Sequence, residues 1–334
     1  MMRRWLCCAT LLLGACDPQP TFLAHSGHTM GTQYRVSAAC PSVSQAQLAE
    51  VVEGQLVAVN EDMSTYLPGS LISRFNAARP GEWFTVSPSL AFVVGVARTV
   101  SDESAGAFDV TVGPLVDLWG FGPAQAPSRR PTDAELADAM AQVGNAHLAV
   151  RESPPALNKH IDLAVDLSAL AKGYGVDRVA DAIAALGCDN YLVDVGGEVR
   201  VAGRNRRGQL WRVGVEVPDA TQIGGLQRVL ALTDAAVATS GDYRNFLELD
   251  GLVVAHTIDP RTGKPADHAL ASVTVVHPLA VWADAYATAI LVLGPEAGMA
   301  FADQRGLAAL LIVRQASGFV ERYTAPMQQY LVSS

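Results

Sequence analysis

The chain has 334 residues, of which half are hydrophobic and 17% are charged, and its formal net charge is −9. The length suits one large domain or two fused ones, and the composition is that of a globular protein rather than a disordered or collagen-like chain. Nucleic-acid binding is excluded from the expected functions, because it needs clustered Lys and Arg to displace phosphate counterions.

The first residues have the pattern of an export signal. Arg3 and Arg4 precede an apolar run over 5–13, which is shorter than the roughly 20 apolar residues of a membrane-spanning helix. Leu-Gly-Ala-Cys at 13–16 resembles a bacterial lipobox, in which the Cys receives a diacylglycerol after cleavage. We therefore predict a signal peptide over 1–15 and lipidation of Cys16, with an ordinary cleaved signal as the alternative. Asp17 resembles the signal that retains lipoproteins at the inner membrane, which predicts a lipid-anchored protein on the periplasmic side of that membrane.

The rest of the chain is expected to be a short tether and one compact body. Pro and Gly residues indicate a tether over 16–27, and the body follows over 28–334. In the processed chain only Cys40 and Cys188 would remain as free or paired cysteines. An oxidising compartment permits a bridge between them, but two separate buried thiols are equally compatible with the sequence.

Helix and strand patterns alternate along this body. Apolar residues at helical spacing predict an amphipathic helix over 45–63. Ser87-Pro88 predicts the start of a helix that runs to about 104, and a capping box from Thr132 to Glu135 predicts another. The alternating segment 160–167 predicts a strand, followed by a helix from a cap at Ser168 to Gly187. Further strands are expected over 191–195, 211–217, 229–232, 247–257 and 272–276, with one helix over about 279–293.

This order of elements favours an α+β fold with largely antiparallel sheets and packed helices. The chain contains no GxGxxG after a first strand and no GxxxxGK[ST]. Neither a dinucleotide-binding Rossmann site nor a P-loop can therefore be predicted.

A pair of oxygen-bearing side chains lies in the predicted helix near 284. Asp284 and Thr288 are four residues apart, so they share one helix face. A carboxylate and a hydroxyl are hard oxygen ligands, as Mg²⁺ prefers. Their neighbours are Ala and large apolar residues, which predicts burial, and a buried carboxylate usually has a partner. The alternative is an Asp that faces solvent.

Two further side chains suit the chemistry of a phosphorylated ligand. His256 lies where a strand meets a turn rich in Pro and Gly, and a neutral imidazole there could accept a proton from a hydroxyl. Lys172 lies in the first turn of a predicted helix, where exposed amides also favour an anion. A structural His and a solvated Lys remain the alternatives. Turns at 194–198 and 240–244 offer backbone amides to a ligand. Together these residues indicate a metal-assisted enzyme that acts on a phosphorylated ligand.

With these motifs in view, the chain resembles the ApbE family, the FAD:protein FMN transferases. The resemblance runs from the first motif into the C-terminal third. The motifs are HTMGT at 28–32, AFDVTVGPLVDLWGFG at 107–122, DLSALAKGYGVD at 166–177, SGDYRNF at 240–246, HTIDPRTGKP at 256–265 and DAYATA at 284–289.

The resemblance also implies roles for individual residues. The flavin contacts of the family fall on Met30, Tyr66, Ala107, Phe108, Asp109, Asp166, Lys172 and Ile258. Its Mg²⁺ ligands fall on the backbone oxygen of Ala169, on Asp284 and Thr288, and on Ala287. His256 matches the histidine thought to activate the acceptor hydroxyl. Lys172 stands where other members have Glu, although Lys also occurs in the family.

The implied reaction is a phosphoryl transfer in which Mg²⁺ bridges the FAD pyrophosphate, a Thr or Ser of a protein attacks the FMN phosphorus, and AMP leaves. The implied fold is α+β with T-fold-like subdomains. The implied acceptors are flavoprotein subunits of Nqr or Rnf type membrane redox complexes. Two alternatives remain open: a Mg²⁺-dependent FAD pyrophosphatase that yields FMN and AMP, and a non-catalytic periplasmic flavin-binding lipoprotein.

Overall fold

The structure is a computed structural model, and it describes residues 21–122, 129–219, 225–242 and 246–332. The predicted signal peptide and Cys16 lie outside these residues. Within the described residues, no helix is long and apolar enough to cross a membrane.

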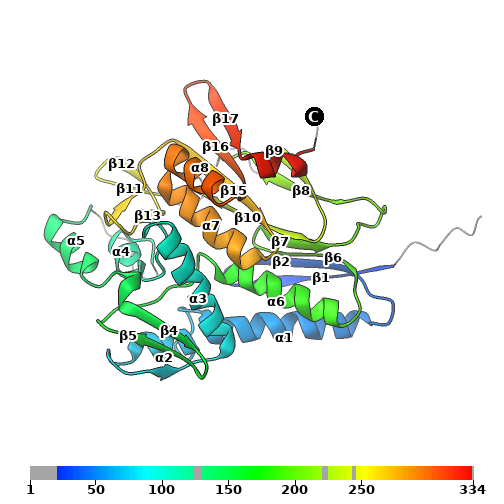
Figure 1. Ribbon diagram of the computed structural model, residues 1–334, viewed down its shortest axis with the longest axis horizontal. Helices are drawn as coiled ribbons and strands as arrows, with labels where there is room; N and C mark the ends of the chain where they lie inside the picture. The colour runs from blue at the N-terminus through cyan, green and yellow to red at the C-terminus, as the bar shows by residue number, and fades with distance from the viewer. Residues whose placement is uncertain (1–20, 123–128, 220–224, 243–245, 333–334) are drawn as a thin grey trace, which may run out of the picture.

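One antiparallel sheet of eight strands organises the molecule (Figure 1). Its strand order is β1-β2-β6-β7-β10-β15-β16-β17, and each pair of neighbours is antiparallel. The strands are β1 (Phe22–Thr29), β2 (Thr32–Ala39), β6 (Asn190–Val195), β7 (Glu198–Ala202), β10 (Ala235–Gly241), β15 (Leu270–His277), β16 (Ala308–Gln315) and β17 (Gly318–Tyr323).

Helices cover one face of this sheet, and a hairpin covers the other. Helices α6 (Ala171–Ala185) and α7 (Ala280–Leu293) lie on the sheet and against each other, while α1 (Gln45–Met63) packs on α6, and α3 (Pro88–Glu103) and α8 (Pro295–Gln304) pack on α7. On the opposite face, the hairpin of β8 (Trp211–Glu216) and β9 (Leu226–Leu232) closes a second apolar core together with η2 (Ala325–Tyr330).

Smaller elements lie beside the helical face. A three-stranded sheet has the order β3 (Phe84–Thr85), β5 (Pro155–Lys159), β4 (Leu148–Glu152). The remaining elements are α2 (Leu71–Ala77), α4 (Gly113–Leu118), α5 (Asp133–Met140), η1 (Asn145–His147), and the strand pairs β11 (Phe246–Leu249) with β12 (Leu252–Ala255) and β13 (Ile258–Asp259) with β14 (Lys264–Pro265). The expected α+β class with largely antiparallel sheets is confirmed.

The helices with strong local signals form where the sequence predicts them. In α1, the five residues Leu48, Val52, Leu56, Val59 and Met63 are buried at helical spacing, as expected. The cap at Ser87 precedes α3, and Thr132 with Glu135 forms the predicted capping box of α5. These signals succeed because both partners of each cap lie within one turn of each other.

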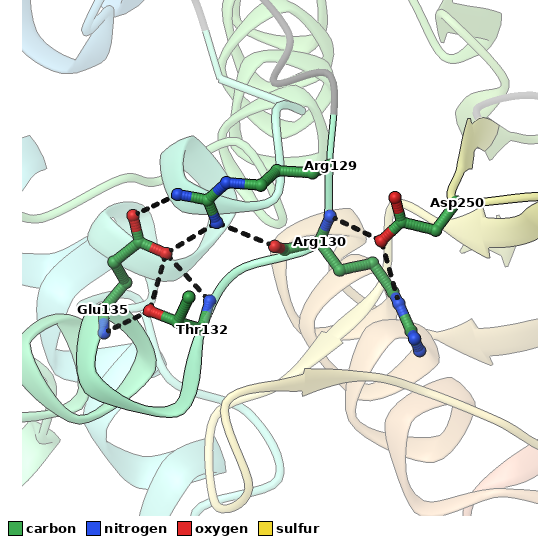
Figure 2. A network of polar contacts seen from close by, with 5 residues as sticks. All are labelled: Arg129, Arg130, Thr132, Glu135 and Asp250. Carbon is green, nitrogen blue, oxygen red and sulfur yellow. Dashed lines mark hydrogen bonds and ion pairs between the residues drawn. The ribbon is translucent and has the colours of Figure 1, made fainter.

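The cap of α5 also ties two distant segments together (Figure 2). Arg129 donates two hydrogen bonds to the Glu135 carboxylate, at 2.8 and 2.9 Å, and its guanidinium together with Thr132 holds the pKa of Glu135 below its usual range. The next residue, Arg130, donates its backbone N–H and its Nε to one oxygen of Asp250, in the turn between β11 and β12. The start of α5 is thus linked to the hairpin whose second strand leads to residue 256.

The region 160–170 differs from the prediction. Strand β5 ends at Lys159, and the expected strand over 160–167 does not form. The buried Nζ of Lys159 donates to the carbonyl oxygens of Asn76 (2.6 Å) and Leu163 (3.0 Å), and the Asn76 side chain bonds both backbone groups of Val165. Side chains therefore satisfy this backbone in place of a neighbouring strand.

The expected cap at Ser168 is also wrong. Helix α6 begins at Ala171, because the hydroxyl and the backbone N–H of Ser168 both donate to Asp166 Oδ1, at 2.5 and 2.8 Å. An Asx turn at Asp166 thus takes the place of a helix cap.

The structure also defines where the folded body begins and whether its two cysteines are paired. Strand β1 begins at Phe22, whose ring packs edge-on against Trp211, so the tether expected over 16–27 cannot extend past residue 21. Cys40 and Cys188 form a disulfide bond, which decides the question that the sequence left open. Helix α8 and strands β1, β2, β7, β10, β16 and β17 were not predicted. Among them, the apolar runs of β10 and β16 do not distinguish a buried strand from a buried helix.

Candidate functional site

A cavity of about 1390 Å³ lies at the end of the main sheet where β2 and β7 begin and β6 and β10 end. Its wall brings together motifs that are far apart in the sequence. The predicted site residues that line it are Tyr66, Ala107, Phe108, Asp109, Asp166, Ala169, Lys172, His256, Ile258, Asp284 and Thr288. These residues come from the connection between α1 and α2, from the loop before α4, from the loop before α6 and its first turn, from the segment after β12, and from α7.

Two predicted site residues are not part of this wall. Met30 lies in the β1–β2 turn with a φ of 49°, and its Sδ and Cε lie over Gly175 of α6, among apolar side chains of the core. Ala287 is fully buried within α7, in the main core. The structure therefore places both side chains in the packing behind the cavity.

A close crossing of α6 and α7 sets the position of Asp284. A Cβ on Gly173 would lie 2.5 Å from the carbonyl oxygen of Ala280 and 2.9 Å from Asp284 Cβ, so only glycine allows this approach. The N–H of Gly173 donates to Asp284 Oδ2 at 3.1 Å, and the carboxylate is 3% exposed. The predicted burial of Asp284 is confirmed, and one of its oxygens already has a partner.

Three charged groups meet beside this crossing. Lys172 Nζ lies 2.6 Å from Glu198 Oε1, and Glu198 is 2% exposed. Burial raises the pKa of Asp284, against the attraction of Lys172, and it raises the pKa of Glu198 to about 8. Burial alone would lower the pKa of Lys172, but the charges of Asp284 and Glu198 outweigh it and raise that pKa. The cluster carries one net negative charge, which suits a cation, at a pH above the pKa of Glu198.

The oxygen atoms around Asp284 fit a hard divalent cation. Asp284, Ala169 and Thr288 all line the wall, and Thr288 Oγ1 is 3.1 Å from Ser240 Oγ. The backbone oxygen of Ala169 is the ligand that the family resemblance implies. Within the described ranges, no three His, Cys, Asp or Glu side chains gather as they would in a zinc site. A mixed set of carboxylate, hydroxyl and carbonyl oxygens is typical of Mg²⁺, which completes its coordination with water and phosphate.

Two predicted flavin-contact residues hold the loops of the cavity in shape. Asp109 accepts hydrogen bonds from the N–H and hydroxyl of Thr111, at 2.8 and 2.7 Å, and from the N–H of Asn145 at 2.8 Å. Asp166 binds Ser168 as described above, and its N–H donates to the Val110 carbonyl at 2.7 Å. These carboxylates fix the backbone that lines the cavity.

His256 follows β12, and its ring packs edge-on against Phe121 with 6.3 Å between centroids. Hydrogen bonds from side chains hold the turn that follows His256. Asp259 binds the guanidinium and the N–H of Arg261, and the Trp119 indole donates to the Gly263 carbonyl at 2.8 Å. The segment that carries His256 is therefore anchored to the end of α4.

The sequence analysis missed Glu198 and Gly173 as site residues. The turn at 194–198 was noted only for its amides, and its last residue proves to be the partner of Lys172. An acidic residue directly after a Gly-Gly turn is the signal that could have drawn attention to it. Gly173 carries no chemistry of its own, so only the helix crossing reveals its role.

The comparisons with known proteins identify the family of the chain. The model of the ApbE family matches residues 30–311. A FAD:protein FMN transferase of Vibrio cholerae is 41% identical over 99% of both chains, and one of Haemophilus influenzae is 38% identical over 96% of this chain and 94% of its own. The solved structure of the flavin transferase ApbE from Vibrio cholerae superposes with a TM-score of 0.86 at 41% identity, and the match covers 93% of this chain and 100% of that one.

The fold is thus that of a family whose named members are transferases of flavin. The chain belongs to the ApbE family. The family resemblance and the enzyme class expected from the sequence are confirmed.

Proposed function

We propose that the chain transfers FMN from FAD to a Thr or Ser hydroxyl of an acceptor protein, in a Mg²⁺-dependent reaction that releases AMP. The observation that carries the proposal is that the oxygen cluster of Asp284 and Thr288 opens into the same cavity as the loops at 107–109 and 256–258. A volume of about 1390 Å³ exceeds the roughly 300–1,000 Å³ of a typical small-ligand site. It leaves room for a dinucleotide and for part of an acceptor.

Different residues of the cavity would bind the metal, supply positive charge and contact the flavin in a phosphoryl transfer. Asp284, Thr288 and the Ala169 carbonyl would hold Mg²⁺, which supplies charge neutralisation at the pyrophosphate when it is bound. Lys172 adds a fixed positive charge beside that position. Phe108, Asp109 and Asp166 line the same wall and would contact the flavin part of the donor.

The bonds of the reaction balance without a further reactant. The acceptor oxygen forms a bond to the FMN phosphorus, and the bond from that phosphorus to the bridging oxygen of the pyrophosphate breaks. AMP leaves with the bridging oxygen. His256 takes the proton of the attacking hydroxyl, a role that suits a neutral imidazole in a cavity wall.

The place of action follows from the N-terminal segment. Lipid on Cys16 would anchor the enzyme at the periplasmic side of the inner membrane, and the short tether would keep the cavity near that surface. Acceptors of the Nqr or Rnf type, flavoprotein subunits of membrane redox complexes, suit this location. The support for this part is the sequence alone.

The test is transfer to a defined acceptor. The purified chain is incubated with FAD, Mg²⁺ and an acceptor domain that carries one target Thr, and flavin fluorescence in a denaturing gel reports the covalent product. We expect a fluorescent band whose mass matches a phosphoester-linked FMN, and none with a Thr→Val acceptor or with excess chelator. Release of FMN and AMP with no labelled acceptor would instead identify a pyrophosphatase. Bound FAD that stays intact would identify a flavin carrier.

A further inference from the structure

The reaction above uses the positive charge of Lys172 but assigns no role to Glu198, its ion-pair partner. Lys172 is the second residue of α6 and Glu198 the first of β7, so the pair joins a helix to the end of the sheet. Its atoms are 2.6 Å apart, Glu198 is almost fully buried, and both residues line the cavity.

Stability alone is a weak reason for such a pair. Removing two charges from water costs about as much as their attraction contributes. Glu198 Oε2 has no hydrogen-bond partner among the described residues, so the carboxylate is only partly satisfied. A buried acceptor without a partner costs free energy. The arrangement therefore points to a task in the cavity.

The third charged group of the cluster, Asp284, indicates what this task is. Lys172 directly precedes Gly173, whose N–H donates to Asp284 Oδ2 at 3.1 Å, and Lys172, Glu198 and Asp284 line the same cavity. An ammonium group on Asp284 would occupy the oxygens that a divalent cation needs. The contact with Glu198 directs Nζ to the other carboxylate, while the Gly173 N–H takes only Asp284 Oδ2.

We propose that Glu198 is a positioning residue that holds Lys172 away from Asp284 and so keeps Asp284 available for the divalent cation. This inference rests on the proposed metal site. In this arrangement Lys172 keeps its positive charge for an anionic ligand without closing the site to the metal. The pair thus keeps the fixed positive charge of Lys172 apart from the exchangeable divalent cation.

A double-mutant cycle on metal binding, without FAD, tests the proposal. Mn²⁺ serves as the probe, and its affinity is measured by titration calorimetry and by electron paramagnetic resonance for the wild-type chain, Glu198→Gln, Lys172→Met and the double variant. Residues in direct contact are energetically coupled, so we expect Glu198→Gln to weaken Mn²⁺ binding roughly tenfold when Lys172 is present. In the Lys172→Met background, Glu198→Gln should weaken Mn²⁺ binding by less than about threefold.

The cycle separates positioning from simple loss of negative charge. If only the charge of Glu198 mattered, Glu198→Gln would weaken Mn²⁺ binding equally in both backgrounds, and that result would overturn the proposal. Unchanged Mn²⁺ affinity with a lower melting temperature would show a purely structural pair and would overturn it as well. A wild-type chain that binds no Mn²⁺ would instead refute the proposed metal site itself.

A matched control comes from another ion pair of the same length. Arg228 and Glu321 also meet at 2.6 Å, between β9 and β17, and neither residue lines the cavity. Glu321→Gln therefore removes a carboxylate paired at the same N–O distance, away from the proposed metal. Its Mn²⁺ affinity should equal that of the wild-type chain, whereas a tenfold loss there would show that Mn²⁺ affinity follows general damage and would contradict the inference.

Discussion

The crossing of α6 and α7 at Gly173 gives the sharpest structural prediction. In Gly173→Ala, the new Cβ would lie 2.5 Å from the Ala280 carbonyl oxygen, and backbone cannot yield as a side chain can. Overpacking of this kind costs about 1–3 kcal/mol. Displacing the Gly173 N–H from Asp284 removes a hydrogen bond to a charged acceptor, which costs about 1.5–3 kcal/mol more. Better helix propensity offsets only about 1 kcal/mol.

We therefore expect Gly173→Ala to lower the free energy of unfolding by about 2–4 kcal/mol, measured by urea denaturation. Because Asp284 moves with the crossing, Mn²⁺ affinity should fall in the same variant. Gly54→Ala is the matched control, since Gly54 lies inside α1 with nothing within 4 Å of a new Cβ. That control should gain about 0.5–1 kcal/mol. A Gly173→Ala chain as stable as the wild type would refute the reasoning.

Three further predictions concern His256 as the general base, Cys16 as the lipid anchor and the pH dependence of stability. His256→Ala should lower FMN transfer roughly 10²- to 10⁴-fold with little change in FAD affinity, whereas a lower melting temperature with full turnover would make His256 structural. Cys16→Ser should release the protein from membranes, and a variant that stays with membranes after a salt wash would exclude lipid anchoring. Asp177 accepts the N–H groups of Ala280 and Val281, and burial raises its pKa from 3.8 to about 6. The folded state therefore binds the proton of the Asp177 carboxyl group more tightly than the unfolded chain does. The contribution of Asp177 to the free energy of unfolding is full below pH 3.8, and it falls by about 3 kcal/mol as the pH rises through 6. Urea denaturation of Asp177→Asn should show a correspondingly smaller decrease over this range, and an unchanged pH profile would contradict the assignment.

The parts of the site that the sequence predicts are those set by local spacing. Asp284 and Thr288 are one turn apart, so any helix through them places both on one face, and both line the cavity. The caps of α1, α3 and α5 are similarly local. Where the chemistry depends on one turn of helix, residue types and spacing are sufficient.

The parts that the sequence could not predict depend on distant contacts. Segment 160–167 alternates like a strand, but Lys159 and Asn76 bind its backbone from outside the segment. The pairing of Lys172 with Glu198 needs the sheet order that places the start of β7 beside α6. The helix crossing at Gly173 needs α7, more than a hundred residues further along the chain. Periodicity carries no information about any of these contacts.

If Asp284 holds the cation that FMN transfer requires, its replacement by Ala should separate FAD binding from transfer. FAD binding by fluorescence titration and FMN transfer to the acceptor are measured on the same preparation of Asp284→Ala over a range of Mg²⁺ concentrations. Loss of a metal ligand removes several kcal/mol of transition-state stabilisation, so transfer should be abolished at every Mg²⁺ concentration while much of the FAD affinity is retained. Transfer by Asp284→Ala at the wild-type rate under limiting Mg²⁺ would contradict the claim.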